Sequence, residues 1–371
     1  MSEFVPETQP QPRLALASRL QHALILAPIT KGSNLPYRRL CQELGARVTM
    51  SEMAVARRLK QDRRNEFALI RRAPDEQCFG VQLAGNNPEE MAWAAELVES
   101  RGADLVDLNL GCPIDYFTSK GLGAALGREP RRVQRIVAAM KARVKIPVTV
   151  KIRLGWNDER RNYLEVSRAA VDAGADAIVV HGRTRAARYT MRADWDAIGE
   201  VVAAVPVPVV GNGDVLFRPD LDAAFARSGC AAVMTARGAL IKPWIFREAI
   251  AGSWDPTAEE RLALYRRYVT FAKEHWGSDE RGLKRMHDFL VWHVGFWARY
   301  VPPRADGTYP SMQVRESWAP RSPLEALLAR SDRAAHEFLT ARLMHEQEIE
   351  PADAPLPGDE TPIDDDVAEA G

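Results

Sequence analysis

The sequence predicts an α/β fold, a (β/α)8 TIM barrel, followed by a smaller all-α helical domain. Between residues 24 and 250, short apolar runs alternate with amphipathic stretches, and eight such units over about 230 residues suit this barrel. After residue 253 the apolar runs stop, and only helical patterns remain. Polar residues also follow each apolar run at the same end, as they do in barrels that carry an active site.

The strands of the barrel are expected where the apolar runs lie, and the helices where amphipathic stretches connect them. Pro88, followed by Glu89 and Glu90, makes a good first helical turn. Proline suits the first helical position, and acidic side chains suit the positive end of the helix dipole. The expected strands are 24–27, 47–51, 79–83, 105–109, 148–152, 177–181, 207–211 and 231–235, and the expected helices include 88–100, 131–141 and 163–173.

A doubly wound open sheet is the alternative α/β architecture. That fold would require a phosphate-binding loop directly after its first strand, with the pattern G-x-G-x-x-G. Residues 28–32 read Pro-Ile-Thr-Lys-Gly and lack this pattern. The barrel is therefore the favoured architecture.

Four regions are expected along the chain. They are a disordered, polar and proline-rich lead-in (1–20), the catalytic barrel (21–252), a helical domain (253–348) and an acidic disordered tail (349–371). The helical domain is expected to contain helices over 257–275, 282–300 and 323–344.

The charge of the chain is unevenly distributed, although 50 basic and 50 acidic side chains balance overall. Residues 350–371 hold eight acidic side chains and no basic one, which leaves an excess of eight basic side chains in residues 1–349. A basic body suits a polyanion such as nucleic acid. A solubilising tail on an ordinary basic enzyme explains the same distribution, so charge alone leaves the partner open.

The four cysteines, Cys41, Cys78, Cys112 and Cys230, are widely spaced and form no C-x-x-C pair. This spacing argues against a disulfide framework and against a cysteine-based zinc site, and no metal is expected. A reducing compartment is the natural setting, so the protein is expected to be cytoplasmic. No apolar run is long enough to span a membrane. Nothing in the sequence implies an obligate protein partner, so a monomer is expected.

Polar side chains at eight strand ends describe a lined pocket at the mouth of the barrel. The loops at 211–213 and 236–238 follow the last two strands, where barrels often bind phosphate through backbone N–H groups. Arg237 would add a charged donor there. Lys151, inside the mouth, would stabilise negative charge on the N1/O2 edge of a reduced flavin. Together these residues predict flavin mononucleotide (FMN) as the cofactor.

Each of these residues also has a purely structural interpretation. Glycines after strands usually form turns, and His181 can be a hydrogen-bonded core histidine. Cys112 can be a small buried hydrophobic residue, which is the usual role of a free cysteine. Lys151 is harder to explain in this way, because burying an unpaired ammonium is costly.

The segments at the strand ends resemble those of the tRNA-dihydrouridine synthase family, in order and with similar spacing over residues 24–250. The segments are Ala-Pro-Ile (27–29), Ser-Glu-Met (51–53), Val-Gln-Leu-Ala-Gly (81–85), Asp-Leu-Asn-Leu-Gly-Cys-Pro (107–113), Val-Lys-Ile-Arg (150–153), His-Gly-Arg-Thr (181–184), Ala-Asp-Trp (193–195), Gly-Asn-Gly-Asp (211–214) and Ala-Arg-Gly-Ala (236–239).

Further segments resemble the branch of this family that acts on uridine 47 of tRNA. They are Gly-Ser-Asn-Leu-Pro-Tyr-Arg-Arg (32–39), Gly-Cys-Pro-Ile-Asp (111–115), Arg-Tyr-Thr (188–190), Gly-Ala-Leu-Ile-Lys-Pro-Trp (238–244) and Glu-His-Trp-Gly-Ser-Asp (274–279). Members of that branch usually carry N-terminal Cys/His zinc fingers, for which this sequence has no matching cysteines.

The resemblance implies a role for each residue that matches the pattern of the family. Cys112 is implied to be the catalytic proton donor, and Asn109, Arg153 and Tyr189 are implied to bind the substrate. Contacts with FMN are implied for Pro28, Ile29, Thr30, Gln82, Lys151, His181, Asn212, Gly213, Asp214, Ala236 and Arg237.

The implied reaction reduces a uridine in tRNA to 5,6-dihydrouridine. It requires a hydride at C6, which N5 of reduced FMN supplies, and a proton at C5 from an acid on the opposite face of the base. A thiol that stays protonated at neutral pH suits the second role. NADPH or NADH is the expected reductant, and because the sequence has no nicotinamide-binding fingerprint, the reductant is expected to enter by the same mouth before the tRNA.

A uridine inside folded tRNA must be extruded before it can enter such a pocket. The basic stretch within residues 57–72 lies beside the second strand and could hold backbone phosphate, although a solvated helix face explains it equally well. Aromatic and basic side chains also mix over residues 284–297. Core packing is the favoured interpretation there, with RNA contact limited to the basic edge.

Two alternative functions remain open from the sequence. The first is an FMN-dependent barrel reductase that acts on a small-molecule pyrimidine or an enone. It explains the pocket but not the basic body or the added helices. The second is a non-catalytic RNA-binding protein, which the presence of Cys112, Lys151 and His181 argues against.

Overall fold

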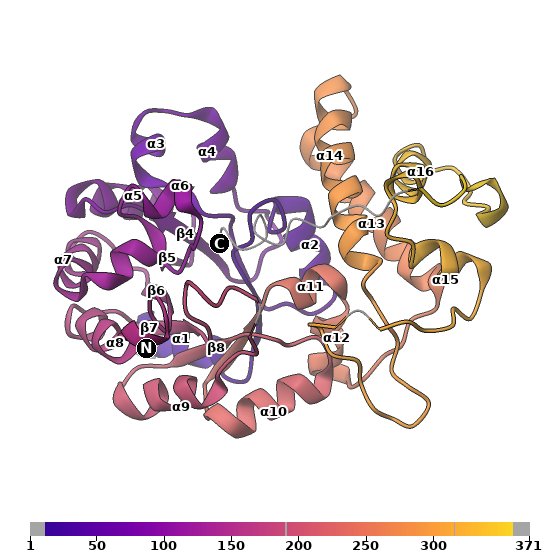
Figure 1. The fold of residues 1–371 in the computed structure, drawn as a ribbon. Helices are drawn as coiled ribbons and strands as arrows, with labels where there is room; N and C mark the ends of the chain where they lie inside the picture. The colour runs from indigo at the N-terminus through magenta and orange to yellow at the C-terminus, as the bar shows by residue number, and fades with distance from the viewer. Residues whose placement is uncertain (1–11, 190, 315, 359–371) are drawn as a thin grey trace, which may run out of the picture.

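A closed parallel barrel forms the first two thirds of the protein in this computed structural model, which describes residues 12–189, 191–314 and 316–358 (Figure 1). The ring closes because the strand at Val48–Met50 pairs with the strand at Leu24–Leu26 on one side and with the strand at Phe79–Ala84 on the other. The eight strands of the ring are β1 (Leu24–Leu26), β2 (Val48–Met50), β4 (Phe79–Ala84), β5 (Leu105–Leu110), β6 (Val148–Arg153), β7 (Ala177–His181), β8 (Val209–Asn212) and β9 (Ala232–Thr235). The predicted (β/α)8 barrel is confirmed.

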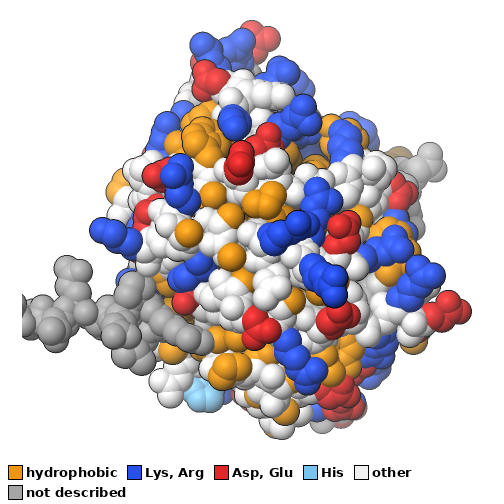
Figure 2. All heavy atoms as spheres, turned by 90° about the vertical axis from the view of Figure 1, so that its left-hand side faces the viewer, with side chains coloured by type: hydrophobic (Ala, Val, Ile, Leu, Met, Phe, Trp, Pro, Cys, Tyr) orange, Lys and Arg blue, Asp and Glu red, His pale blue; other side chains and the backbone are white. Residues whose placement is uncertain are grey.

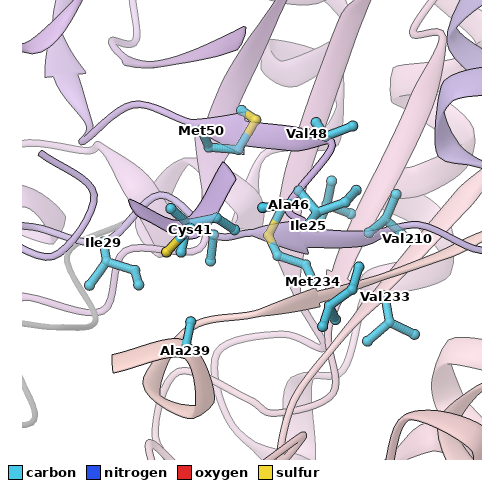
Figure 3. Packing of buried hydrophobic residues seen from close by; sticks show 14 of the residues in the cluster. Ile25, Ile29, Cys41, Ala46, Val48, Met50, Val210, Val233, Met234 and Ala239 are labelled. Atoms are coloured by element: carbon cyan, nitrogen blue, oxygen red, sulfur yellow. The ribbon is translucent and has the colours of Figure 1, made fainter. Parts of the chain in front are cut away.

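Every residue of these strands is buried, which explains why they read as near-continuous apolar runs in the sequence. Figure 3 shows this packing around β1, where Ile25 lies among Val48 of β2, Val210 of β8 and Met234 of β9. A short additional strand, β3 (Ala54–Val55), continues the course of β2 after a break at residues 51–53 and pairs only with β4. This break was not predicted.

Helices form the outer layer of the barrel. In Figure 1, α5, α7 and α8 lie on its left side, and α9 and α10 lie below. Asn34, Asn87 and Asp194 each accept a backbone hydrogen bond at the start of a helix, which is why these helices begin where they do. The outer layer includes the helices α2 (Leu35–Glu43), α5 (Pro88–Ser100), α7 (Pro130–Lys141), α8 (Tyr163–Asp172), α9 (Trp195–Ala204) and α10 (Arg218–Ser228). The helices predicted at 88–100, 131–141 and 163–173 match to within one residue.

The outer face over α5, α7 and α8 carries basic and acidic side chains that are interspersed with one another (Figure 2). A polyanion is attracted by a continuous surface of one sign, which this face lacks. The helical side of the barrel is therefore the expected solvated surface.

Four helices follow the barrel: α13 (Ala258–Trp276), α14 (Glu280–Trp297), α15 (Pro323–Leu328) and α16 (Arg333–Met344). The prediction of a single helix over 323–344 was wrong. The first helix ends at Leu328 and a second one begins at Arg333, where the carboxylate of Asp332 caps α16 by accepting from the N–H of Ala335 at 3.0 Å.

The helices α13 and α14 share one hydrophobic core with the barrel. Tyr37 of α2 packs edge-on against His293 of α14, with ring centroids 4.8 Å apart, and its hydroxyl donates to the carbonyl of Ala239 at 2.6 Å. Tyr265 and Phe289 complete the contact from α13 and α14. The core is therefore continuous across the predicted domain boundary at residue 252.

Both chain termini differ from the expected disordered segments where the structure describes them. Pro12–Leu20 form helix α1, and Leu16 and Leu20 lie in the core at the end of the barrel opposite the mouth. At the other terminus, Ile349 is buried and Pro351–Asp353 form a turn of 3-10 helix. Apolar side chains therefore anchor parts of both segments, and residues 1–11 and 359–371 lie outside the described ranges.

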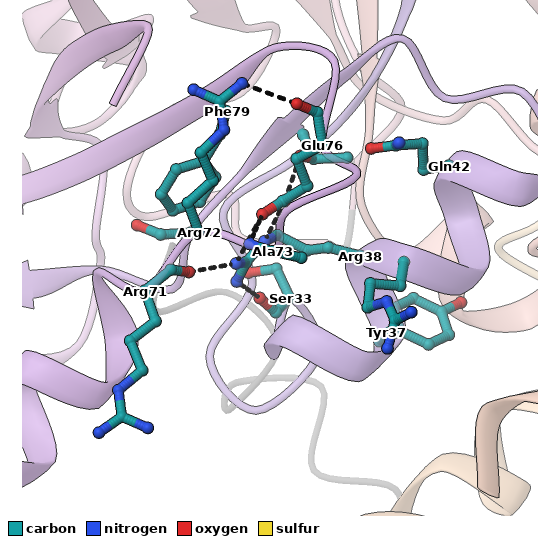
Figure 4. A network of polar contacts seen from close by, with 12 residues as sticks. Ser33, Tyr37, Arg38, Gln42, Arg71, Arg72, Ala73, Glu76 and Phe79 are labelled. Atoms are coloured by element: carbon teal, nitrogen blue, oxygen red, sulfur yellow. Dashed lines mark hydrogen bonds and ion pairs between the residues drawn. The ribbon is translucent and has the colours of Figure 1, made fainter. Parts of the chain in front are cut away.

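A buried ion pair ties the first loop of the barrel to the segment before β4 (Figure 4). Arg38 of α2 pairs with Glu76 at 2.7 Å and also donates to the carbonyl oxygens of Ser33 and Arg71. The Glu76 carboxylate also accepts from the Thr49 hydroxyl at 2.8 Å. Removing either partner would leave a buried charge without compensation, so this pair holds the loop after β1 in place.

No helix within the described ranges is long and apolar enough to cross a membrane. The same residues contain no group of three or more His, Cys, Asp or Glu side chains that could hold a metal ion.

Candidate active site

The polar residues that the sequence singled out meet at one end of the barrel, because the carboxyl ends of parallel strands share one edge. Alternate residues of a strand face the same side. The inward-facing side chains of β5, β6 and β7 that are aligned across the strands therefore form successive levels inside the barrel. The register aligns Asp107 with Thr149, then Asn109 with Lys151, and then Arg153 with His181. We call these three levels, together with the loops above them, the mouth.

The lowest level is a closed network of hydrogen bonds. Gln82 donates to Asp107 at 2.8 Å and accepts from Asn109 at 2.7 Å. Thr149 donates to the other oxygen of Asp107 at 2.6 Å. Burial raises the pKa of Asp107 to about 6, and the hydrogen bonds from Thr149 and Gln82 oppose that rise. Gln82, predicted to contact the flavin, is thus fixed from two sides.

Asn109 holds the loop that carries Cys112. Its side-chain oxygen accepts from the backbone N–H of Gly111 at 3.1 Å and of Cys112 at 2.9 Å. Sequence reasoning assigned Asn109 to the substrate. The structure shows that its oxygen orients the cysteine, while its amide nitrogen bonds Gln82.

Cys112 is fully buried in a small apolar cluster with Met53 and Ala84, against which Ile114 and Phe117 pack. Its carbonyl accepts from the N–H of Ala124 at 3.0 Å. Gly123 approaches so closely that a Cβ there would lie 2.7 Å from that carbonyl oxygen, and its φ is +57°. A ligand can reach the sulfur only after this cluster parts.

Two arginines hold the same loop from neighbouring strands. Arg153 of β6 donates to the carbonyl of Gly111 at 2.8 Å and to that of Thr184 at 3.1 Å. Arg185 donates to the carbonyl of Pro113 at 3.2 Å and forms an ion pair with Asp115. Arg153 was predicted to bind substrate. Arg185 was not predicted, because nothing local in its sequence indicates a partner 72 residues earlier.

Lys151 and His181 are both buried at the mouth. Burial holds the pKa of His181 well below its ordinary value, and the positive charges of Arg153, Lys151, Arg183 and Arg237 lower it further. His181 is therefore neutral at physiological pH.

Residues predicted to surround the cofactor phosphate do meet at one corner of the mouth. They line a cavity of about 20 Å³, which has room for roughly one water. The residues of this corner are His181, Tyr189, Asn212, Gly213, Asp214, Ala236 and Arg237, joined by Arg183 and Met312.

Tyr189 belongs to this corner. Its ring lies over the guanidinium of Arg237, 3.2 Å from ring centroid to guanidinium carbon. The sequence had assigned Tyr189 to the substrate, but the structure places it among the predicted cofactor residues.

Asp214 organises the corner through bonds that sequence reasoning did not find. Both of its oxygens accept from Arg183 at 2.7 Å, and one also accepts from the backbone N–H of Ala193 at 2.7 Å. Gln313, from the segment after α14, donates to the same carboxylate at 3.1 Å. Arg183 lies within the His-Gly-Arg-Thr segment, so its sequence offered a signal. Gln313 lies 99 residues from Asp214 and offered none.

Pro28, Ile29 and Thr30 follow β1, which pairs with β9, so they lie on the side of the mouth next to this corner. The side chain of Ile29 is fully buried in the core (Figure 3), and its N–H donates to the Ser33 hydroxyl at 2.9 Å. Thr30 is partly exposed. Any contact of this segment with a ligand would therefore come from Pro28, Thr30 or the backbone.

The corner suits an anionic group. Arg183 and Arg237 bring two positive charges to it, and Asp214 lies 2.7 Å from the first and 3.7 Å from the second. A neutral His181 adds a hydrogen-bonding side chain without charge. Charge-assisted donors of this kind hold phosphate, so the donor set fits the phosphate end of a flavin mononucleotide. Tyr189 and Met312 line the cavity and would have to shift to admit it.

A family model for dihydrouridine synthases matches residues 25–292 of this chain. Curated relatives include a tRNA-dihydrouridine(47) synthase [NAD(P)(+)]-like protein of Oryza sativa, 41% identical over 84% of this chain. A human protein with the same name is 43% identical over 75% of the chain. A tRNA-dihydrouridine(47) synthase [NAD(P)(+)] of Coprinopsis cinerea is 41% identical over 83%.

This chain spans less than half the length of each of these relatives, since the matches cover 46%, 43% and 48% of them. The matched part of this chain includes the whole barrel and reaches into α14.

Proposed function

This chain belongs to the dihydrouridine synthase family, and from this premise we propose that it reduces a uridine of tRNA to 5,6-dihydrouridine. The observation that carries the proposal is the placement of Cys112 at the barrel mouth, on a loop that Asn109 and Arg153 hold from two sides. Position 47 is the first target to test, because relatives that are 41% and 43% identical to this chain carry that number in their names.

We propose that Lys151, His181, Asn212 and Arg237 hold FMN, with its phosphate at the corner that Asp214 organises. When bound, the flavin supplies the hydride for C6 of the uracil. The protein must then place the ring against that cofactor and supply the remaining proton. Gln82 is fixed by Asp107 and Asn109, so it presents a preset hydrogen-bonding edge to whatever lies above it.

Cys112 supplies the proton. Its S–H bond breaks as a C–H bond forms at C5, and the resulting thiolate regains a proton from solvent after the product leaves. This step needs the thiol within reach of C5 on the face of the base opposite the hydride donor. The hydrogen bonds to Gly111 and Cys112 set the position of the loop for that purpose.

NADPH or NADH is the proposed reductant, in keeping with the names of the relatives. Both the reductant and the uridine would enter through the one mouth, so they would bind in turn. Spectra showing that NADPH bleaches the flavin only when RNA is present would contradict this order.

A basic groove on the outer side of the barrel supports tRNA as the substrate. It is a cavity of about 560 Å³ between α2, the segment after α4 (Arg64–Leu69) and the end of α13. Its basic lining residues are Arg39, Arg71, Arg72 and Arg101, with His275. Arg39 and Arg72 are paired with carboxylates, at Glu274 and Asp104.

Among the residues that the structure describes, neither Arg71 nor Arg101 forms an ion pair. Both can therefore bind backbone phosphate without breaking an existing pair. The pKa of His275 falls to about 4 because of burial and the positive charges of Arg71, Arg38 and Arg285. The groove thus has the positive potential that attracts a polyanion.

The proposal is tested by mapping dihydrouridine in tRNA from cells with and without this protein, and in unmodified tRNA incubated with the purified protein, FMN and NADPH. We expect the protein to bind FMN, with absorbance near 450 nm, and to produce dihydrouridine at one position. A flavin-containing protein that reduces free uracils or enones but leaves tRNA unchanged would favour a small-molecule reductase. A protein that binds tRNA without flavin would overturn the enzymatic function.

A further inference from the structure

Tyr116 is a large aromatic side chain that lies exposed beside the Cys112 loop. It belongs to the short helix α6 (Asp115–Thr118), four residues after the cysteine, and 51% of its surface is exposed. The next residue, Phe117, packs onto the cluster that covers Cys112. The two rings meet edge-on, with centroids 5.2 Å apart, so one ring faces the cysteine and the other faces solvent.

Two basic side chains flank the exposed ring. The ammonium of Lys120 lies 3.4 Å from the ring centroid. Arg58, from helix α3 (Ala56–Lys60), donates to the Tyr116 hydroxyl at 2.9 Å. These two positive charges lower the pKa of Tyr116, with the hydrogen bond from Lys120 the larger cause.

The orientation of the ring is set in advance of any ligand. Arg58 is itself held by an ion pair with Glu66 at 3.0 Å, and this pair fixes the donor that binds the Tyr116 hydroxyl. Lys120 has no carboxylate partner among the residues that the structure describes. An aromatic ring and an ammonium without a carboxylate partner at one place suit a ligand that is both aromatic and anionic, which is the chemistry of a nucleotide.

We propose that Tyr116, Arg58 and Lys120 form a nucleotide platform, on which a base next to the target uridine stacks while Lys120 and Arg58 contact its phosphate. This inference rests on the proposed function. A uridine that leaves its stack exposes the faces of its neighbours, at a cost of a few kcal/mol. An exposed aromatic ring at the mouth offers one of those neighbours a new stacking partner and so offsets part of the cost.

A structural role would require the ring to be buried or its hydroxyl to bond the core. Neither is found, because the ring is half exposed and the hydroxyl bonds Arg58 and Lys120, neither of which is buried. The contact of α6 with Cys112 is made by Phe117. Tyr116 can therefore be changed while the packing over the cysteine is kept.

The first test compares Tyr116→Ala with Tyr116→Phe on a tRNA whose dihydrouridine position has been mapped. Loss of one stacked base lowers kcat/KM by about 5- to 150-fold in Tyr116→Ala, through KM, while kcat at saturating tRNA stays within about twofold. Tyr116→Phe keeps the ring and stays within about threefold of wild type. Ile250→Ala removes another exposed apolar side chain, far from the mouth on α12 (Ile245–Ala251), and serves as the matched control.

A second measurement detects the stacking itself. The base on each side of the target uridine is replaced in turn by 2-aminopurine, whose fluorescence is quenched by stacking. We expect wild type and Tyr116→Phe to quench one of the two probes on binding and Tyr116→Ala to leave it bright. A fall in kcat with unchanged KM and unchanged quenching would assign Tyr116 a structural role and overturn the platform.

The outcome is separable from that of the proposed function. If wild type forms no dihydrouridine in tRNA, the proposed function fails. If wild type is active and Tyr116→Ala matches it in kcat/KM and in probe quenching, only the platform is wrong.

Discussion

The mouth of the barrel and the junction between the barrel and α14 both bury polar side chains, but they treat them differently. At the mouth, Gln82, Asp107 and Thr149 are all hydrogen-bonded within one network. We call the second region the aromatic junction, formed by Tyr37, Tyr265, Phe289, His293 and Trp297. Within the described residues, the Tyr265 hydroxyl and the indole N–H of Trp297 have no hydrogen-bond partner.

This difference separates two reasons for burying a polar group. A buried polar atom without a partner lowers the folding stability by about 1–3 kcal/mol. The unpaired side chains of the junction therefore stabilise the fold through the packing of their rings and not through their polar atoms. At the mouth the same cost is avoided by pairing, and pairing also fixes direction. Paired polar atoms at the mouth should therefore be indispensable, whereas the unpaired ones at the junction should be replaceable by apolar groups.

The largest expected effect separates two buried cysteines. Cys112→Ala is expected to lower the rate of dihydrouridine formation by about 10²- to 10⁴-fold, because a positioned acid contributes that much, while FMN binding is kept. Cys41→Ala, on α2 beside the junction, is the matched control and should leave the rate unchanged. Single-turnover formation of dihydrouridine measures both. Equal rates for the two variants would remove Cys112 from the chemistry.

The second expected effect breaks the network at the mouth. Thr149→Val keeps the shape of the side chain but removes the donor to Asp107, and we expect the free energy of unfolding at pH 8 to fall by about 1.5–3 kcal/mol, as for hydrogen bonds to charged groups. Urea unfolding measures it. Because the pKa of Asp107 is about 6, the carboxyl is mostly protonated at pH 5, and the loss should be smaller there.

The third expected effect concerns pH and the junction. Burial lowers the pKa of His293 to about 3, so between pH 8 and pH 5 the unfolded chain gains a proton at this histidine and the folded chain does not. Folding stability therefore falls as the pH falls through about 6.5, the ordinary pKa of histidine.

His293→Phe removes this dependence, and the variant should lose about 2 kcal/mol less than wild type between pH 8 and pH 5. Any packing change caused by the larger ring acts equally at both pH values and cancels from the difference. Identical pH differences for the two proteins would show that His293 is not buried in its neutral form.

The smallest expected effect compares two tyrosines within the junction. Tyr265→Phe removes a hydroxyl that has no partner and should change the free energy of unfolding by less than about 1 kcal/mol, toward greater stability. Tyr37→Phe leaves the buried carbonyl of Ala239 unpaired and should cost about 1–3 kcal/mol. If Tyr265→Phe costs as much as Tyr37→Phe, the distinction between paired and unpaired polar atoms does not hold in this region.

Sequence reasoning succeeded where the signal is local. The strands of the barrel, and the helix at Pro88–Ser100, follow from apolar periodicity and from residues that begin a helix. It failed where a long-range contact decides. Pro12–Leu20 read as a polar lead-in, but α1 forms because Leu16 and Leu20 find the core. The break between α15 and α16 depends on the cap at Asp332, which sequence reasoning overlooked.

The candidate site shows the same division. The residue types at the strand ends identified the mouth, and they include Cys112, Lys151 and His181. Their partners were not predictable. Asn109 was expected to face the substrate, yet its oxygen holds the cysteine loop. Tyr189 was expected near the uracil, yet it lies over Arg237.

The sequence by itself determined the barrel, the end of the barrel that holds the polar residues, and the family to which the chain belongs. Strand period, turn residues and short segments are encoded over a few neighbouring positions, so they can be read directly. Only the tertiary structure decided that Arg185 holds the Cys112 loop and that Gln313 bonds Asp214. Those contacts join residues 72 and 99 positions apart, and their existence depends on the path of the whole folded chain.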